Sequence, residues 1–259
     1  EVELDIYRFE LGISYAIDDR WDATLRVPYF IKDQRTSVEF PFGGTAAERA
    51  AAIANGQIHH RTETYRGFSD WELAAGWRKQ HVFGTGTVMR ASIGLTVPVG
   101  ATEENTLTAG AAGLRHLHIQ FGNGTVDPIL DFYAGFPFHS KWAASIFAKA
   151  RLPFYENGNG FRGAPEGLIS PRVTWLPHKR FSLSGGVAAG VQGYTYWDGV
   201  KDPNSGQFTL NSIFSAGYRL TDQITGSLSF LHPIHSISLG GEDEFKAGPT
   251  VSMSVGYSF

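Results

Sequence analysis

Residues 7–16, YRFELGISYA, carry the pattern that decides the fold. The odd-numbered residues, beginning with Tyr7, are aromatic or aliphatic, and the even-numbered ones, beginning with Arg8, are charged or small. Successive side chains of a β-strand point to opposite faces, so this alternation predicts a strand with one apolar and one polar face. Residues 21–31, WDATLRVPYFI, repeat the pattern directly after two aspartates, which predicts a tight hairpin.

The same period of two continues to the end of the chain and predicts eleven antiparallel strands. They cover residues 7–16, 21–31, 70–78, 89–97, 126–136, 142–152, 172–175, 181–192, 208–219, 224–230 and 251–259. Short turns are expected at 18–20, 81–86, 137–141, 177–180 and 221–223, and long connections lie between them. The sequence therefore predicts an all-β, up-and-down sheet in which short and long connections alternate.

Alternation of this kind is also typical of a soluble β-sandwich, but three features favour a transmembrane β-barrel. Most of the strands reach the roughly 9 to 11 residues that a tilted strand needs to cross hydrocarbon. Barrels in outer membranes have short periplasmic turns and long external loops, which fits the spacing. Aromatic residues also gather on the apolar face beside the short turns, as an interfacial girdle would: Tyr15, Trp21, Trp77, Phe136, Trp142, Trp175, Phe181 and Tyr218.

Composition excludes several other classes. The chain has 259 residues, a formal net charge of -3 and no cysteine, which rules out disulfides and thiolate metal sites. No apolar run approaches the roughly 18 residues of a membrane helix. No charged segment followed by an apolar one opens the sequence, so we expect any secretory signal to have been removed or left out. Neither a phosphate-binding glycine loop nor a basic patch for nucleic acid is present.

The last strand ends in Tyr257, Ser258 and Phe259, with apolar residues at every second position before them. This segment resembles the C-terminal recognition signal of bacterial outer-membrane barrels. The resemblance implies a location in the bacterial outer membrane, contact with its lipid and lipopolysaccharide, and assembly by the barrel assembly machinery through Tyr257 and Phe259.

A second resemblance covers roughly residues 5–133. Its motifs are Tyr7-Arg8-Phe9, Val27-Pro28-Tyr29, Gly67-Phe68-Ser69-Asp70, Leu95-Thr96-Val97-Pro98-Val99-Gly100 and Gly122-Asn123-Gly124. Their order is similar to the outer-membrane transporters associated with the phenol meta-cleavage pathway. This chain has Ser69-Asp70 where the family usually has Gly-Asp, and Pro98-Val99-Gly100 where it has Pro-Thr-Gly. The resemblance implies passage of small aromatic or hydrophobic compounds.

An even number of strands is the rule for bacterial single-chain barrels, so we predict about 12, with one not accounted for. The missing strand is either upstream of Glu1 or formed by residues 117–121. The chain is expected to be a single domain, residues 1–259, with a long first external loop at 33–66. Within that loop, residues 45–55, TAAERAAAIAN, predict a short helix with a threonine at its start.

Charged residues of both signs fall on the polar face and are the candidate pore lining: Arg8, Glu10, Asp22, Arg26, Asp70, Glu72, Arg78, Arg90, Asp127, Asp131, Lys149, Arg151, Arg172 and Arg219. One interpretation is that they pair and fill a narrow interior. The other is that small residues such as Gly12 and Gly186 leave a water-filled path with a modest preference for anions. We expect a channel or transporter for passive passage of small solutes.

Two other classes of function compete with a channel. A plugged barrel could bind a protein partner through external loops at 155–166, 194–207 and 232–247. A lipid-hydrolysing enzyme would need a nucleophile beside a base, for which His139 with Ser140 and His235 with Ser236 are the candidates. Histidine pairs 59/60, 116/118 and 232/235 offer too few ligands for a named metal site. We therefore expect no enzymatic activity, no metal and no cofactor.

Overall fold

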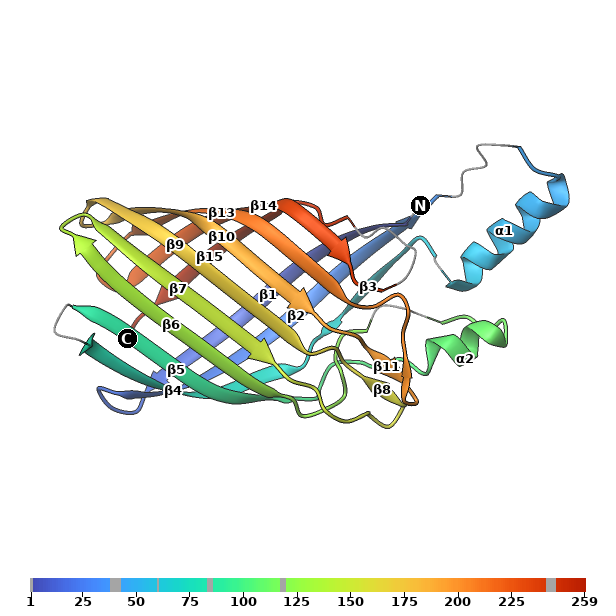
Figure 1. Cartoon of the computed structure of the whole chain (residues 1–259), viewed down its shortest axis with the longest axis horizontal. Helices are drawn as coiled ribbons and strands as arrows, with labels where there is room; N and C mark the ends of the chain where they lie inside the picture. Colours follow the sequence, from blue (N-terminus) through green and yellow to red (C-terminus); the bar gives the residue numbers. More distant parts are fainter. Residues whose placement is uncertain (1, 38–42, 60, 83–85, 117–119, 241–245) are drawn as a thin grey trace.

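The computed structural model describes residues 2–37, 43–59, 61–82, 86–116, 120–240 and 246–259, and a single curled sheet dominates it (Figure 1). Antiparallel strands follow one another along this sheet in chain order. The path consists of β1 (Val2–Ala16), β2 (Trp21–Thr36), β4 (Trp71–Val82), β5 (Thr87–Val97), β6 (Pro128–His139), β7 (Trp142–Arg151), β9 (Glu166–His178), β10 (Phe181–Gln192), β13 (Gln207–Arg219), β14 (Ile224–Ser238) and β15 (Thr250–Tyr257). These are the eleven strands that the alternation predicts, so the all-β fold class is confirmed.

The register keeps apolar side chains together on one face. In the first hairpin Leu11 pairs with Val27 and Tyr15 with Ala23, and every second residue between them is polar or small. The apolar side chains lie on the outer face and are exposed, with Leu11 61% and Met253 80% accessible. Hydrocarbon outside the sheet explains this exposure, because the outward side chains of a transmembrane barrel form an apolar band that contacts lipid.

A twelfth strand of this sheet, β3 (Glu63–Phe68), lies off the main path. It pairs with residues 29–34 of β2, whereas β4 pairs with residues 21–26 of the same strand. The path of the described residues begins at β1 and ends at β15, and these two strands run in the same direction. Because β3 lies off this path, it is not the additional strand that an even number of strands requires. Residues 117–119, the core of the alternative at 117–121, lie outside the described residues.

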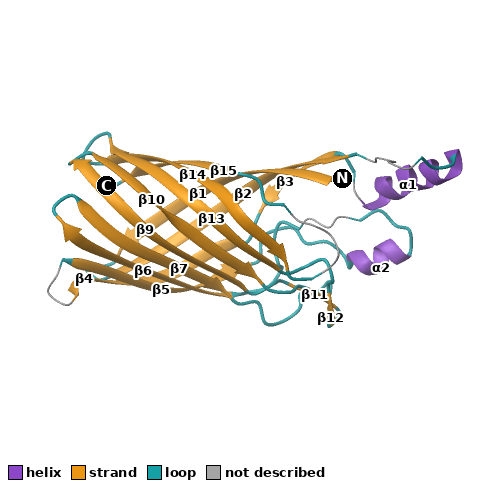
Figure 2. Cartoon of the chain, turned by 45° about the horizontal axis from the view of Figure 1, so that its top comes forward, coloured by secondary structure: helices purple, strands orange, loops and turns teal. Residues whose placement is uncertain are grey.

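The two ends of the sheet differ sharply (Figures 1 and 2). One end carries the short turns and the C-terminus, and the other carries α1 (Ala46–His59), α2 (Thr106–Ala111) and the long loops. There β8 (Phe161–Arg162), β11 (Tyr196–Trp197) and β12 (Val200–Lys201) form a small three-stranded sheet. Its core is the contact of Phe161 with Trp197, whose ring centroids are 4.7 Å apart.

Three expected boundaries differ from the structure. The first loop is shorter than 33–66, because β2 continues to Thr36 and β3 begins at Glu63. The helix starts after Thr45, which exchanges capping hydrogen bonds with Glu48, but it runs past Asn55 to His59. Part of the expected loop at 232–247 is strand, because β14 continues to Ser238 after a bulge. No helix in the described parts of the chain is both long and apolar enough to span a membrane.

Candidate pore-lining site

The inner face of β1 to β7, which we call the charged wall, holds ion pairs that reach across intervening strands. Arg90 on β5 extends over β4 to Asp22 on β2, with Nε 3.0 Å from Oδ2 and Nη2 2.5 Å from Oδ1. The residue of β4 beneath this bridge is Gly76. A Cβ atom there would clash with the Arg90 guanidinium and lie 2.7 Å from Asp22 Oδ1. Glycine at this position therefore leaves room for the ion pair to cross the strand, and a larger residue would displace the two side-chain ends.

A second bridge spans a wider part of the sheet. Lys149 on β7 donates to both carboxylate oxygens of Glu72 on β4, each at 2.7 Å, and so passes over β5 and β6. Glu72 also accepts from Arg26 on β2 at 3.1 Å. The long side chains of this triad therefore lie across the inside of the curled sheet.

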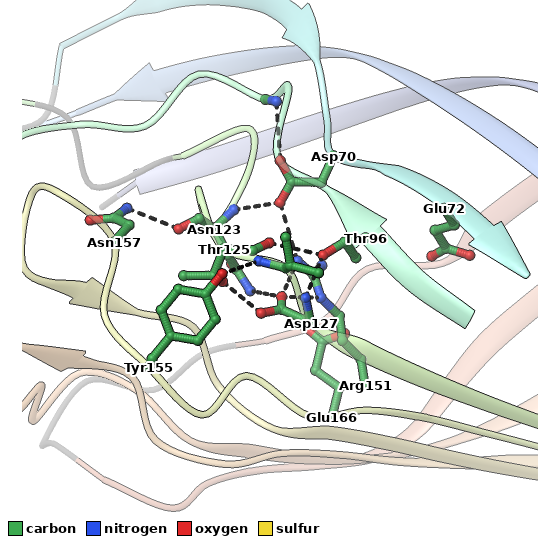
Figure 3. A network of polar contacts seen from close by, with 12 residues as sticks. Asp70, Glu72, Thr96, Asn123, Thr125, Asp127, Arg151, Tyr155, Asn157 and Glu166 are labelled. Atoms are coloured by element: carbon green, nitrogen blue, oxygen red, sulfur yellow. Dashed lines mark hydrogen bonds and ion pairs between the residues drawn. The ribbon is translucent and has the colours of Figure 1, made fainter. Parts of the chain in front are cut away.

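The third cluster is the most buried (Figure 3). Arg151 Nη2 lies 2.7 Å from Asp127 Oδ2 and 3.3 Å from Asp70 Oδ2, and both carboxylates are almost fully shielded, with side-chain exposures of 0% and 1%. Backbone N–H groups of Gly100 and Asn123 donate to Asp70 at 3.1 and 2.7 Å. Buried charges persist only when they are paired and hydrogen-bonded in this way.

This cluster also fixes the loop between β5 and β6. Asp127 accepts from Thr125 Oγ1 at 2.6 Å and from Asn123 Nδ2 at 2.9 Å. On the opposite side of the loop, Lys32 Nζ donates to the carbonyl of Gln120 at 2.5 Å. The loop is thus tied to Lys32 on β2 and to Asp70 directly before β4, near the end that carries the helices.

Little free space remains among the charged side chains. The cavity lined by Arg26, Glu72, Arg90 and Asp131 has a volume of about 10 Å³. A single water needs roughly 10 to 15 Å³ by the same measure, so the gap between these side chains holds at most one water. Asp131 accepts from Ser92 at 3.3 Å through one oxygen, and its other oxygen has no hydrogen-bond partner among the described residues.

The inner face of β9 to β15, which we call the hydroxyl wall, has a different composition. Cross-strand partners form a row of hydroxyl side chains, in the order Thr174, Ser184, Ser215, Ser229 and Ser252. Ser229 Oγ donates to Ser215 Oγ at 2.8 Å, and in the next row Ser227 and Ser254 are 2.7 Å apart. Glycines such as Gly186 and Gly190 lie further along this face.

Arg172 on β9 stands where the two walls meet. Its Nε donates to Ser170 Oγ at 3.1 Å, and no carboxylate of the described residues lies within ion-pair distance. Arg172 pairs in register with Ser145 of β7 on one side and Gly186 of β10 on the other. It is therefore a half-buried cation whose charge is not balanced by any carboxylate in the described part of the chain.

The remaining predicted pore residues have separate surroundings. Arg8 and Glu10 form an exposed ion pair on β1. Arg78 lies opposite Arg90 in the register of β4 and β5. Arg219 is the exposed last residue of β13, where its backbone N–H donates to the carbonyl of Arg180.

The predicted aromatic girdle consists of cross-strand neighbours near the short turns. Trp21 pairs with Trp77, Trp142 with Trp175, and Phe181 with Tyr218, while Phe136 lies opposite Ala144 and Tyr15 opposite Ala23. The Trp142 and Trp175 rings stack with centroids 6.1 Å apart. At the C-terminus the rings of Tyr257 and Phe259 stack at 6.3 Å, and Phe259 is 93% exposed.

Several residues of the buried cluster were not predicted as site residues. Thr96, Asn123 and Thr125 complete the hydrogen bonds around Asp127. The motif Gly122-Asn123-Gly124 was the available signal, because it marks a tight approach of the loop to Asp70: a Cβ at Gly122 would clash with that carboxylate.

The histidine candidates assemble no larger site in the described residues. His139 Nδ1 and Ser140 Oγ are 3.3 Å apart in an exposed turn, without a described carboxylate to orient the ring. No group of three or more His, Asp or Glu in the described chain is arranged to hold a metal ion. His60 and His118, named in two of the histidine pairs, lie outside the described residues.

Comparisons with known proteins agree with this architecture. No family model and no curated protein sequence matches the chain. The COG4313 outer membrane channel from Pseudomonas putida F1 superposes with a TM-score of 0.63 at 14% identity, over 98% of this chain and 82% of that one. OmpTdeltaL8, a loop-deletion mutant of an outer membrane protein of Vibrio cholerae, gives a TM-score of 0.44 at 10% identity over 99% of both chains.

The strand order, the exposed apolar outer face and the polar inner face define a bacterial outer-membrane β-barrel, as predicted. Within that class the chain resembles the COG4313 outer membrane channel in fold.

Proposed function

We propose that the barrel is a passive channel for small solutes and that they pass along the hydroxyl wall. The observation that carries this proposal is the contrast between the two walls. Long paired side chains occupy the charged wall, whereas the serine, threonine and glycine side chains of the hydroxyl wall are short. Barrels between the filled eight-stranded kind and the wide sixteen-stranded porins have room for a narrow passage.

Arg172 gives this path a preference for anions. Arg172 has no acidic partner among the residues that the structure describes, and such a cation beside a polar path attracts anions, whereas the paired arginines of the charged wall are already neutralised. Small aromatic compounds that carry a carboxylate or phenolate are the first solutes to test, since the sequence motifs resemble those of the phenol-pathway transporters. The proposal assigns the chain no catalytic role and no cofactor.

Cysteine scanning in a planar bilayer tests the proposal, because the chain contains no native cysteine. Ser215 and Ser212 lie on the same strand but on opposite faces. We expect a charged thiol reagent to reduce the conductance of Ser215→Cys and to leave Ser212→Cys unchanged. Arg172→Gln should reduce the preference for chloride over potassium more than Arg90→Gln does. Equal responses of the two cysteine variants would contradict a path along the hydroxyl wall.

A specific observation supports a second candidate, a closed barrel that binds a partner. The loop between β5 and β6 is tied to the charged wall through Asp70 and Lys32, at the end where the long loops gather. If Asp70→Asn and Lys32→Gln together convert a silent barrel into a conducting one, the loop closes the passage and this second candidate is favoured.

The exposed aromatic end of β15 supports a further part of the proposal, recognition of the last strand by the barrel assembly machinery. Removing the Phe259 ring by Phe259→Ser should lower the amount of assembled barrel in cells without changing the stability of the folded protein.

A further inference from the structure

A shallow groove lies on the outer face, near the end that carries the short turns. It has a volume of about 620 Å³ and runs over β7, β9, β10, β13 and β14, which lie side by side in Figure 1. Gly185 and Ala216 form its floor, since their side chains are the smallest of the outward residues that line it. The stacked Trp142 and Trp175 form its wall on the turn side.

Packing within the sheet does not require the glycine in the floor. A Cβ atom at Gly185 would lie 3.7 Å from the Phe214 ring, which is an ordinary van der Waals contact. Phe214 and Phe230 are cross-strand partners that close the groove on the side away from the turns. A larger side chain at position 185 would therefore fit the fold while filling the groove.

A row of cations lies at the turns next to the groove. Lys141, Lys179 and Arg180 are all exposed, and we call them the cationic rim. The backbone brings them together, because Lys141 accepts from Leu176 of β9 and Arg180 accepts from Arg219, each at 2.8 Å. Asp222 is the single acidic residue in the β6–β7, β9–β10 and β13–β14 turns, whereas the turn between β1 and β2 contains Asp18 and Asp19.

We propose that the groove and the cationic rim together bind one anionic phospholipid of the periplasmic leaflet, with an acyl chain in the groove and the phosphate at the rim. The groove is as large as ordinary ligand sites, roughly 300 to 1,000 Å³, and its walls are apolar. Tryptophan at its turn end suits the boundary between acyl chains and headgroups. Clustered cations beside a membrane attract anionic lipid. This site depends on the barrel fold and not on the proposed channel.

Native mass spectrometry of the full chain in detergent, titrated with phosphatidylglycerol or phosphatidylethanolamine, tests the proposal. We expect one phosphatidylglycerol to bind more tightly than the zwitterionic lipid. Gly185→Leu should raise its Kd about tenfold, the effect of losing contact with about two methylene groups. Lys179→Gln combined with Arg180→Gln should abolish the preference for the anionic lipid.

Two matched controls lie elsewhere on the same protein. Ala75→Leu enlarges a lipid-facing residue on β4 outside the groove, and Arg20→Gln removes a cation from the turn between β1 and β2. Both should bind lipid like the unchanged protein. Ala216→Leu replaces Gly185→Leu if the latter does not fold. Equal Kd values for all variants would overturn the proposal, and so would groove variants that shift only a monomer–dimer equilibrium, since a second copy would then be the occupant.

Discussion

The charged wall and the hydroxyl wall belong to the same sheet and have the same strand geometry, yet they manage their polar side chains differently. On β1 to β7, carboxylates and cations reach across strands and satisfy each other. On β9 to β15, hydroxyls bond to their nearest cross-strand neighbours, and Arg172 lacks an acidic partner among the described residues. The charged wall therefore carries ion pairs that brace neighbouring strands from the inside, whereas the hydroxyl wall carries the short side chains along which we propose that solutes pass.

The largest expected effect breaks the most buried cluster. Arg151→Leu leaves Asp127 and Asp70, both almost fully shielded, without their counter-charge. Loss of one partner of a buried pair typically costs about 3 to 5 kcal/mol. Denaturant unfolding in lipid vesicles measures the change. Arg172→Leu in the hydroxyl wall is the control, and its cost should stay within about 1 kcal/mol because only a hydroxyl hydrogen bond is lost. Equal costs would mean that the two walls do not differ.

The next effect compares lipid with the hydroxyl wall. Ile93 points outward and is 65% exposed, so Ile93→Arg places a charge in hydrocarbon and should cost about 2 to 4 kcal/mol. Ser215→Arg points inward and should cost no more than about 1 kcal/mol if the hydroxyl wall borders water. The same unfolding experiment gives both values. A large cost at Ser215 would show that the hydroxyl wall is dry.

A smaller effect sharpens the role of glycine in the charged wall. Gly76→Ala forces a methyl group between Arg90 and Asp22 and should destabilise the barrel by about 1 to 3 kcal/mol. Gly12 also faces inward, on β1, but no heavy atom lies within 4 Å of a Cβ built there. Gly12→Ala should therefore change the free energy of unfolding by less than about 1 kcal/mol. Similar losses for both would argue against the cross-strand bridge.

The smallest effect concerns one turn from each half. Asp18 Oδ1 accepts from the N–H groups of Arg20 and Trp21, both at 2.7 Å, and these bonds hold the pKa of Asp18 below its ordinary value of 3.8. Thr221 Oγ1 caps the β13–β14 turn in the same manner through Gln223 and Ile224.

A carboxyl group whose pKa is lower in the folded than in the unfolded protein stabilises the folded state at pH values above its unfolded-state pKa. This stabilisation is lost as the pH falls through the pKa of the folded state. Amide hydrogen exchange at Trp21 should therefore accelerate, relative to its intrinsic rate, on acidification below pH 3.8, while exchange at Ile224 should not. Parallel behaviour of the two amides would assign the change to global loosening.

The sequence predicted the strands well because lipid outside the barrel enforces alternation at nearly every outward position. The pattern failed where the backbone changes phase. In β14 an extra residue opposite Leu210 and Asn211 shifts the alternation near Pro233. The alternation therefore predicted a strand that ends at residue 230, whereas β14 continues to Ser238. The β3 segment, ETYRGF, is short and mixed, and only its pairing with β2 identifies it as a strand.

The sequence predicted the charged residues as one inward-facing set, but it could not predict which of them form ion pairs with one another. Arg151 forms ion pairs with Asp127 and Asp70 and not with Asp131. We attribute this pairing to the curvature of the sheet and to the path of the β5–β6 loop, which bring those two carboxylates to it. Neither curvature nor loop path leaves a periodic signal in the sequence. For the same reason the distinction between a paired wall and a hydroxyl wall emerges only from the register.

The ion pair between Lys149 and Glu72 also bears on how fast the barrel unfolds. Its partners are 77 residues apart in sequence and three strands apart along the sheet, so β4 to β7 must all be in place before it can form. Contacts that form after the folding transition state contribute little to the folding rate and mainly slow unfolding. We therefore expect the bridge to form late, and so to lengthen the lifetime of the inserted barrel without hastening its insertion.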